Sequence, residues 1–129
     1  MALPFPADCR YADSHEYVRV DGDSWRLGLS AFAIDQLGDI VFVELPELGA
    51  RLSKGQSFGS VESVKAVEDL IAPVSGQVVA RNEAVLASPE ELQNDPYGEG
   101  WLLLIQPADA AELEGLLDAA TYGAKVEGH

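Results

Sequence analysis

The sequence predicts a mainly β fold: a sandwich or barrel with short peripheral α-helices and a C-terminal helix. Short segments of strand-type residues follow one another along the chain, and turn signals separate them at close spacing. Between and after these segments, a few stretches begin with helix-capping residues. With 129 residues, 47% of them hydrophobic, the chain is long enough for one domain with a substantial core.

Strands are expected wherever an apolar or alternating run lies between turn residues. The clearest runs are residues 17–20, 25–29, 40–45, 77–81 and 101–105. Turn residues are found at 21–24, 47–49 and 54–56. The run at residues 101–105 is apolar throughout, so we expect a buried strand there.

Two short helices are expected from their first residues. Ser30 is a favourable N-cap and Gly38 a favourable C-terminal stop, so a helix should lie between them. Its apolar face would consist of Phe32, Ala33 and Leu37. Residues 88–91, Ser-Pro-Glu-Glu, have the pattern of a capping box with proline at the first helical position, and residues 94–98 break the helix that follows.

A closing helix is expected near the C-terminus. Asp109 and Glu112 form a capping pair ahead of an apolar stripe. The stripe consists of Leu113, Leu116 and Leu117. Beyond Gly123 the tail, residues 124–129, is expected to be frayed.

One lysine interrupts a β-type alternation and is expected at the tip of a hairpin. Residues 58–60 run toward Lys65, and residues 70–76 lead away from it. It is one of only three lysines, it has acids on both sides, and in a tight turn its amine would point at solvent. On residue type alone, such a lysine is a solvating turn residue. A catalytic amine usually needs burial or a neighbouring cation, and neither is expected here.

The charge balance narrows the classes of partner. The chain has 8 lysines and arginines against 22 aspartates and glutamates, a net charge of −14, which argues against nucleic acid and anionic membrane surfaces. No apolar run approaches the length of a membrane span. The acidity fits a shuttle that meets partners with basic patches, and it equally fits a solubility coat.

The sequence has no signature of an enzyme or of a metal site. There is no glycine-rich phosphate loop, no nucleophile elbow and no Cys/His metal spacing. Cys9 is the only cysteine, so no intrachain disulfide can form, and we interpret it as a bystander thiol. A presented lysine without acid–base machinery indicates a non-catalytic group carrier, whose cofactor supplies the reactive atoms.

The residues around Lys65 resemble the modification site of lipoyl-carrying domains. The motif reads Glu62-Ser63-Val64-Lys65-Ala66, with Gly59 before it and Ala72-Pro73-Val74-Ser75-Gly76 after it. Biotin carriers have methionines on both sides of the modified lysine, whereas Val64 and Ala66 occupy those positions here. The resemblance therefore favours lipoate, attached covalently to Lys65, over biotin.

Three further blocks resemble the glycine cleavage system H-protein family: residues 15–20, 36–46 and 94–102. Tyr17 stands where that family commonly has tryptophan, a change that keeps an amphipathic aromatic side chain. The resemblance implies one lipoyl-carrier domain, residues 1–129, with a core of about 11–117. It also implies a lipoyl-domain-like hybrid fold, and the added helices favour the H protein over a lipoyl module of a larger acyltransferase.

The resemblance also implies a reaction cycle and its partners. Glycine decarboxylase, a pyridoxal phosphate enzyme, would load an aminomethyl group onto the oxidised lipoyl arm. A tetrahydrofolate-dependent aminomethyltransferase would take the one-carbon unit and release ammonia. Dihydrolipoamide dehydrogenase would then reoxidise the dithiol, and a lipoate-attaching enzyme would have modified the lysine beforehand. The free protein is expected to be a monomer.

Two groups of site residues follow from the resemblance. Glu62, Ser63, Ala66 and Glu68 surround the modified lysine. The two glutamates are candidates for recognition by the attaching enzyme, and they equally fit solvated residues of the turn. The loaded arm ends in an ammonium group that hydrolyses in water, and a cleft that shelters it needs oxygen ligands. The resemblance assigns these to Ser14, Glu16 and Asp69. Without it, all three are ordinary loop or turn residues.

Several alternatives remain open from the sequence. The same lysine could pass its lipoyl group to other complexes as a lipoate relay. The chain could be an unmodified interaction module, although the intact motif speaks against this. A Schiff-base enzyme using Lys65 is disfavoured by its expected exposure. The N-terminus lacks secretion and transit signals, so the bacterial cytoplasm is the default location, and a mature organelle form is the alternative.

Overall fold

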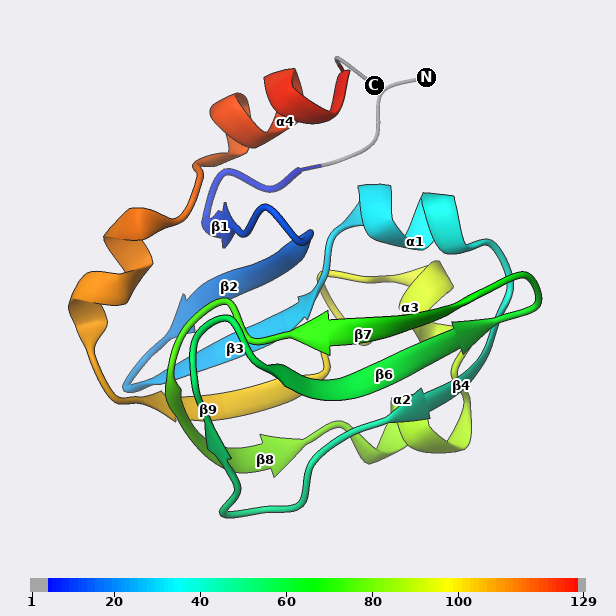
Figure 1. Ribbon diagram of the computed structural model, residues 1–129, viewed down its shortest axis with the longest axis horizontal. Helices are drawn as coiled ribbons and strands as arrows, with labels where there is room; N and C mark the ends of the chain where they lie inside the picture. Colours follow the sequence, from blue (N-terminus) through cyan, green and yellow to red (C-terminus); the bar gives the residue numbers. More distant parts are fainter. Residues whose placement is uncertain (1–4, 128–129) are drawn as a thin grey trace.

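The structure is a computed structural model that describes residues 5–127, and it contains two antiparallel β-sheets (Figure 1). The larger sheet has the order β1 (Cys9–Tyr11), β2 (Glu16–Asp21), β3 (Ser24–Leu29), β9 (Leu103–Pro107), β8 (Gly76–Arg81), β5 (Arg51–Leu52). The smaller sheet has the order β4 (Ile40–Glu44), β6 (Ser57–Ser63), β7 (Val67–Ile71). The predicted mainly β sandwich is therefore confirmed.

Short helices lie around the sheets. They are α1 (Ala31–Leu37), α2 (Glu83–Ala87), α3 (Glu91–Asn94), a 3-10 helix η1 (Ala110–Gly115) and the C-terminal α4 (Ala119–Glu127). In Figure 1, α1 and α4 occupy the same end of the molecule, beside the β1–β2 connection. No helix among the described residues is long and apolar enough to span a membrane.

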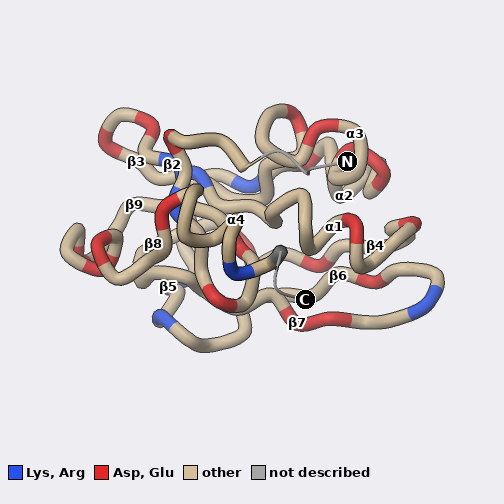
Figure 2. Tube along the Cα trace, turned by 90° about the horizontal axis from the view of Figure 1, so that it is seen from above, with Lys and Arg blue, Asp and Glu red and all other residues tan. Residues whose placement is uncertain are grey.

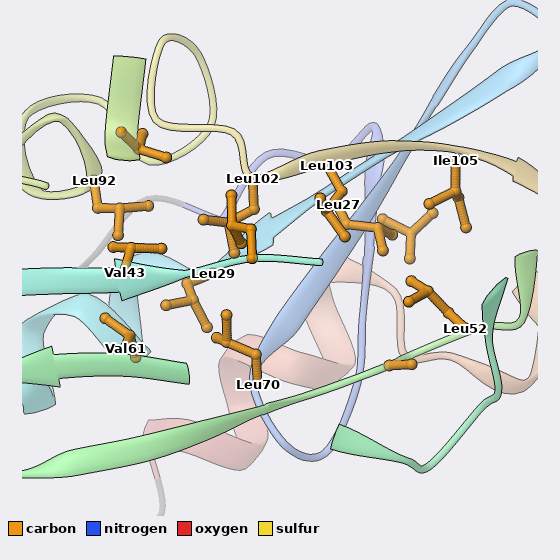
Figure 3. Close-up of a cluster of buried hydrophobic side chains, with 14 of the residues drawn as sticks. Leu27, Leu29, Val43, Leu52, Val61, Leu70, Leu92, Leu102, Leu103 and Ile105 are labelled. Atoms are coloured by element: carbon orange, nitrogen blue, oxygen red, sulfur yellow. The ribbon is translucent and has the colours of Figure 1, made fainter. Parts of the chain in front are cut away.

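The main core lies between the inner faces of the two sheets. Figure 3 shows leucine, isoleucine and valine side chains from both sheets meeting there. Leu27, Leu103 and Ile105 come from β3 and β9, while Val61 and Leu70 come from β6 and β7, and all five are buried. Apolar burial on this scale is the dominant favourable term in folding, so this core holds the β6–β7 hairpin onto the larger sheet.

A second, aromatic cluster attaches the C-terminal helix. Tyr122 of α4 stacks on Tyr11 of β1, with ring centroids 4.6 Å apart, and Phe5 meets the Tyr122 ring edge-on at 5.1 Å. Val126 is buried in the same cluster. The prediction of a frayed tail is thus wrong for residues 124–127, which continue α4, because the burial of Tyr122 and Val126 stabilises the helix past Gly123. Residues 128 and 129 lie outside the described part of the chain.

Local signals misplaced two helices. Ser88 was predicted to be the N-cap of a helix, but it is the C-cap of α2, a helix that the sequence did not predict. The N-cap of α3 is Glu90, whose side chain makes no capping hydrogen bond. The closing helix that starts at Asp109 is a short 3-10 turn, although the Asp109 side chain does cap it by accepting from Ala111 N.

Two further predicted features are shifted. Helix α1 has the expected ends, but its buried side consists of Ala31, Ile34 and Leu37, while Phe32 and Ala33 are half-buried. The last strand begins at Leu103 rather than at residue 101.

Gly59 allows the close approach of two strands of the smaller sheet. A Cβ at this position would lie 2.2 Å from the backbone oxygen of Glu44, which cannot move without shifting β4. We expect Gly59→Ala to lower the free energy of unfolding by about 1–3 kcal/mol, measured by urea titration. Gly123→Ala is the matched control: its Cβ would make an ordinary 3.5 Å contact with Phe5. Because alanine favours a helix interior, that variant should gain about 0.5–1 kcal/mol. Equal stability of the two variants would contradict this expectation.

Candidate functional site

Lys65 lies in the turn between β6 and β7 and is exposed. In Figure 2 this hairpin projects from the body of the molecule, with a basic tip and acidic segments along its strands. The predicted position at a hairpin tip is therefore what the structure shows. Its amine is accessible to a modifying enzyme.

The turn that carries Lys65 is held by hydrogen bonds on both sides. The buried Ser63 accepts at Oγ from Lys65 N at 3.3 Å and from Ala66 N at 3.1 Å. Ser63 N donates to Ala66 O at 2.8 Å, and Val64 N donates to Asp39 O at 3.0 Å. The second of these backbone bonds fastens the tip to the segment that follows α1. Ser63 therefore shapes the turn rather than facing a ligand.

The lysine side chain passes over the end of α1. Gly38, the C-cap of α1, has a φ of +78°, a conformation that glycine adopts readily. A Cβ at Gly38 would lie 3.5 Å from Cε of Lys65, so the side chain lies against the glycine. The aliphatic part of Lys65 therefore lies against the C-terminal end of α1.

A cavity of about 540 Å³ lies beside this hairpin. Its walls are α1, β7 and the segment that leads into β2. It is lined by Ser14, His15, Glu16, Leu29, Phe32, Ala33, Gln36, Leu37, Val61, Ala66, Glu68, Asp69 and Leu70. Hereafter we refer to it as the arm cleft. Five predicted site residues line it, namely Ser14, Glu16, Ala66, Glu68 and Asp69, whereas Glu62, Ser63 and Lys65 do not.

Glu16 is a buried carboxyl group in the arm cleft, with 1% of its surface exposed. The Ser14 hydroxyl donates to its Oε1, and Ile71 N donates to its Oε2 at 3.0 Å. Burial raises the pKa of Glu16 to about 7, although both hydrogen bonds act in the opposite direction. Near neutral pH this group therefore exchanges between a neutral acid and a carboxylate that could pair with a cation.

The other two acidic residues of the cleft, Glu68 and Asp69, lie on opposite faces of the smaller sheet. Glu68 pairs across strands with the buried Val61, so it stands on the inner face, at the sheet edge beside the arm cleft. Asp69 pairs with Ser60 and alternates with Glu68, so it belongs to the opposite face. Glu68, predicted only for enzyme recognition, is therefore a second candidate carboxylate for the cleft. Glu62 lies exposed on the outer face, between Phe42 and Val67 in register.

Sequence reasoning missed the apolar wall of the cleft and two of its polar lining residues, Gln36 and His15. Phe32, Ala33 and Leu37 were predicted to be a core face of α1, yet all three also line the cleft, together with Gln36. His15 was noted only as part of the block at residues 15–20 that resembles the H-protein family, and it has a φ of +79°, which residue type does not reveal. Its position between Ser14 and Glu16 was the available signal.

The described residues give little support for a metal site or for a cysteine nucleophile. Within residues 5–127 no group of three or more His, Cys, Asp or Glu side chains could hold a metal ion. Burial raises the pKa of the Cys9 thiol to about 11, so this cysteine is a poor nucleophile at neutral pH.

Comparisons with known proteins agree on one family. A family model described as glycine cleavage H-protein matches residues 9–129. Proteins named glycine cleavage system H protein from Synechococcus sp. (strain CC9902) and Parasynechococcus marenigrum (strain WH8102) are 71% and 69% identical over 126 residues, covering 98% of each chain. A crystal structure of a glycine cleavage system H protein from Mycobacterium marinum superposes with a TM-score of 0.89 at 42% identity, covering 95% of this chain and 99% of that one.

Proposed function

The chain belongs to the glycine cleavage H-protein family, the lipoyl carriers of the glycine cleavage system, and we propose that Lys65 is the residue that carries its lipoate. The carrier is not itself catalytic: the other components of the system act on its arm. The observation that carries the assignment to Lys65 is its exposed position on a fixed turn beside the arm cleft. Lys54 and Lys125 lie elsewhere, and Lys125 pairs with Asp13.

The partners that we propose follow from the chemistry of the arm. Glycine decarboxylase loads the aminomethyl group, the aminomethyltransferase removes it, and dihydrolipoamide dehydrogenase reoxidises the dithiol. Lipoate contributes the disulfide that accepts the group, and the protein contributes the tether and a shelter. We further propose that the free carrier is a monomeric single domain that acts in the bacterial cytoplasm.

The arm cleft is the proposed shelter of the loaded arm. The apolar wall from α1 suits the hydrocarbon part of the lipoyl chain, and the oxygen atoms of Ser14 and Glu16 suit the terminal ammonium. Glu68, on the inner face of β7, and Asp69, on its opposite face, both line the cleft where β7 forms the edge of the smaller sheet, and they add negative charge there. A cleft of this kind holds the aminomethyl group away from water between partner enzymes.

Intact-protein mass spectrometry with peptide mapping tests the attachment site. Protein from a host supplied with lipoate should show one lipoyl mass gain, located on the peptide that contains Lys65. A known lipoyl domain produced in the same host is the positive control. If that control is fully modified while this chain is not, or if the lipoyl group maps to Lys54, the assignment is wrong.

Glu62 offers a test of recognition by the lipoate-attaching enzyme. It lies exposed between Phe42 and Val67 on the outer face, near the hairpin tip, so an enzyme that reaches the Lys65 amine would cover it. We expect Glu62→Gln to slow lipoylation by about fivefold or more, because an exposed ion pair with the enzyme is lost. Initial rates of lipoate incorporation measure this. Glu47→Gln, on a distant turn, is the matched control, and equal rates for the two variants would contradict the role of Glu62.

A further inference from the structure

We propose that Tyr122 of the C-terminal helix is a positioning residue that fastens two walls of the arm cleft together. Its hydroxyl lies 2.7 Å from Nδ1 of His15 and 2.7 Å from Oγ of Ser30. The inference rests on the proposed function of the cleft as a shelter for the loaded arm. Tyr122 itself does not line the cleft, and it would act through the residues that do.

One hydroxyl group can serve both hydrogen bonds. Tyr122 is fully buried, and burial raises its pKa to about 12, so the hydroxyl keeps its proton at neutral pH. Its proton is donated to one of the two partners, and its oxygen accepts from the other. The ring is held firmly, since it stacks on Tyr11 and is covered edge-on by Phe5.

The first partner belongs to the polar wall. His15 lines the cleft between Ser14 and Glu16, the two oxygen ligands proposed for the ammonium group. Its φ of +79° is unfavourable for a residue with a side chain, so surrounding contacts must hold it in place. The bond from Tyr122 to its ring is such a contact, and it thereby sets the position of the neighbouring oxygens.

The second partner belongs to the apolar wall. Ser30 is the N-cap of α1, and its Oγ accepts from Ala33 N at 3.3 Å, while Ala33 itself lines the cleft. The backbone of Ser30 also donates to His15 O at 2.9 Å, so the two walls already meet at this point. The Tyr122 hydroxyl adds a side-chain link at the same junction. α4 therefore braces the cleft from behind.

Loss of the brace should be visible in the chemistry of the loaded arm. Exposure of the aminomethyl thioether to water breaks its carbon–sulfur bond: R–S–CH2–NH3⁺ and H2O give R–SH, formaldehyde and NH4⁺, with no change of oxidation state. The released formaldehyde reports the rate. We expect loaded Tyr122→Phe protein to release it at least about fivefold faster than the wild type, because two hydrogen bonds that fasten the two walls of the cleft together are removed.

Tyr11→Phe is the matched control variant. Tyr11 is equally buried in the same aromatic cluster, but its hydroxyl donates to Pro6 O at 2.9 Å, outside the cleft. Both variants should lose similar amounts of stability in urea, whereas only Tyr122→Phe should hydrolyse faster. Reoxidation of the empty dithiol by dihydrolipoamide dehydrogenase should be equal in all three proteins, because the unloaded arm does not need the cleft. Ser30→Gly is a second probe, since glycine is a tolerated N-cap, and it should also accelerate hydrolysis.

The outcomes separate this inference from the function on which it rests. The proposed role of Tyr122 is supported if the loaded arm hydrolyses slowly in the wild type and in Tyr11→Phe but fast in Tyr122→Phe. Equal protection in all three proteins, or equal loss in both variants, overturns it. If loaded wild-type protein hydrolyses as fast as the same protein unfolded in urea, the shelter role of the cleft itself is wrong, and the brace falls with it.

Discussion

Replacing Lys65 with arginine is expected to abolish glycine cleavage completely while leaving the fold intact. Arginine keeps the positive charge, but its guanidinium does not form the amide that attaches lipoate. The side chain is exposed and no hydrogen bond of the turn depends on it, because Ser63 is bonded only to backbone atoms there. The expected result is no lipoyl mass gain and no glycine-dependent release of carbon dioxide, with an unchanged unfolding curve.

The control for this prediction is Lys54→Arg. Lys54 is also an exposed lysine in a turn, and it precedes β6 as Lys65 follows it. It should be modified fully and support the complete cycle at the wild-type rate. Residual activity of Lys65→Arg would show that another group carries the arm or that the chain works unmodified, and either result would refute the assignment of the lipoate to Lys65.

Shelter of the loaded arm should strengthen as the pH rises through about 7, and Glu16→Gln should remove this dependence. In the empty protein burial favours the neutral acid and holds the pKa of Glu16 near 7. A docked ammonium favours the carboxylate instead, so docking below pH 7 must release a proton. The equilibrium constant for docking should therefore rise by up to about tenfold per pH unit below 7 and level off above it.

Formaldehyde release from loaded protein, divided at each pH by the rate for the same protein unfolded in urea, measures this effect. Glutamine has nearly the same shape as the neutral acid and cannot ionise, so Glu16→Gln should be weakly protected at every pH. Glu62→Gln, which removes an acid outside the cleft, should keep the wild-type profile. A pH profile shared by wild type and Glu16→Gln would contradict the pairing of Glu16 with the ammonium.

The stability of the empty protein provides an independent check on this carboxyl group. Because the pKa in the folded state, about 7, lies above the usual 4.5, the folded protein binds more protons than the unfolded chain between these values. The free energy of unfolding contributed by Glu16 therefore falls as pH rises from about 4.5 to 7 and is constant above that. The difference is on the order of 3 kcal/mol. It should be absent in Glu16→Gln, as measured by urea titration at pH 5 and pH 8.

The hairpin that carries Lys65 could be predicted because its determinants are local. Turn residues and alternation placed Lys65 at a tip without any tertiary information. The resemblance then grouped Ser14, Glu16 and Asp69, and the structure places all three on one cavity. What the sequence lacked was the side of each strand relative to that cavity. As a result, Glu68 was predicted for recognition, although its register places it on the inner face.

The failures arose where distant contacts override local preference. Helix α2 has Asn82 as its N-cap, and the side chain of Asn82 also donates to the carbonyls of Glu99 and Trp101, far away in sequence. Ser88 has the pattern of an N-cap, yet the chain uses it to end that helix. The C-terminal helix continues through Gly123 because Tyr122 and Val126 find an aromatic surface that strand β1 provides. None of these partners is visible in a short sequence window.

The hydrogen-bonded turn that carries Lys65 affects how a lipoyl arm would reach the arm cleft. Because backbone hydrogen bonds to Asp39 and Ala66 hold the turn, an arm attached to Lys65 would start from a fixed point and sweep one limited volume next to the arm cleft. Docking is then intramolecular, with an effective concentration in the millimolar range for a short flexible tether. Even a weak cleft would thus be well occupied, however dilute the carrier. A partner enzyme has only to offer the arm a better site, and no separate opening signal is required.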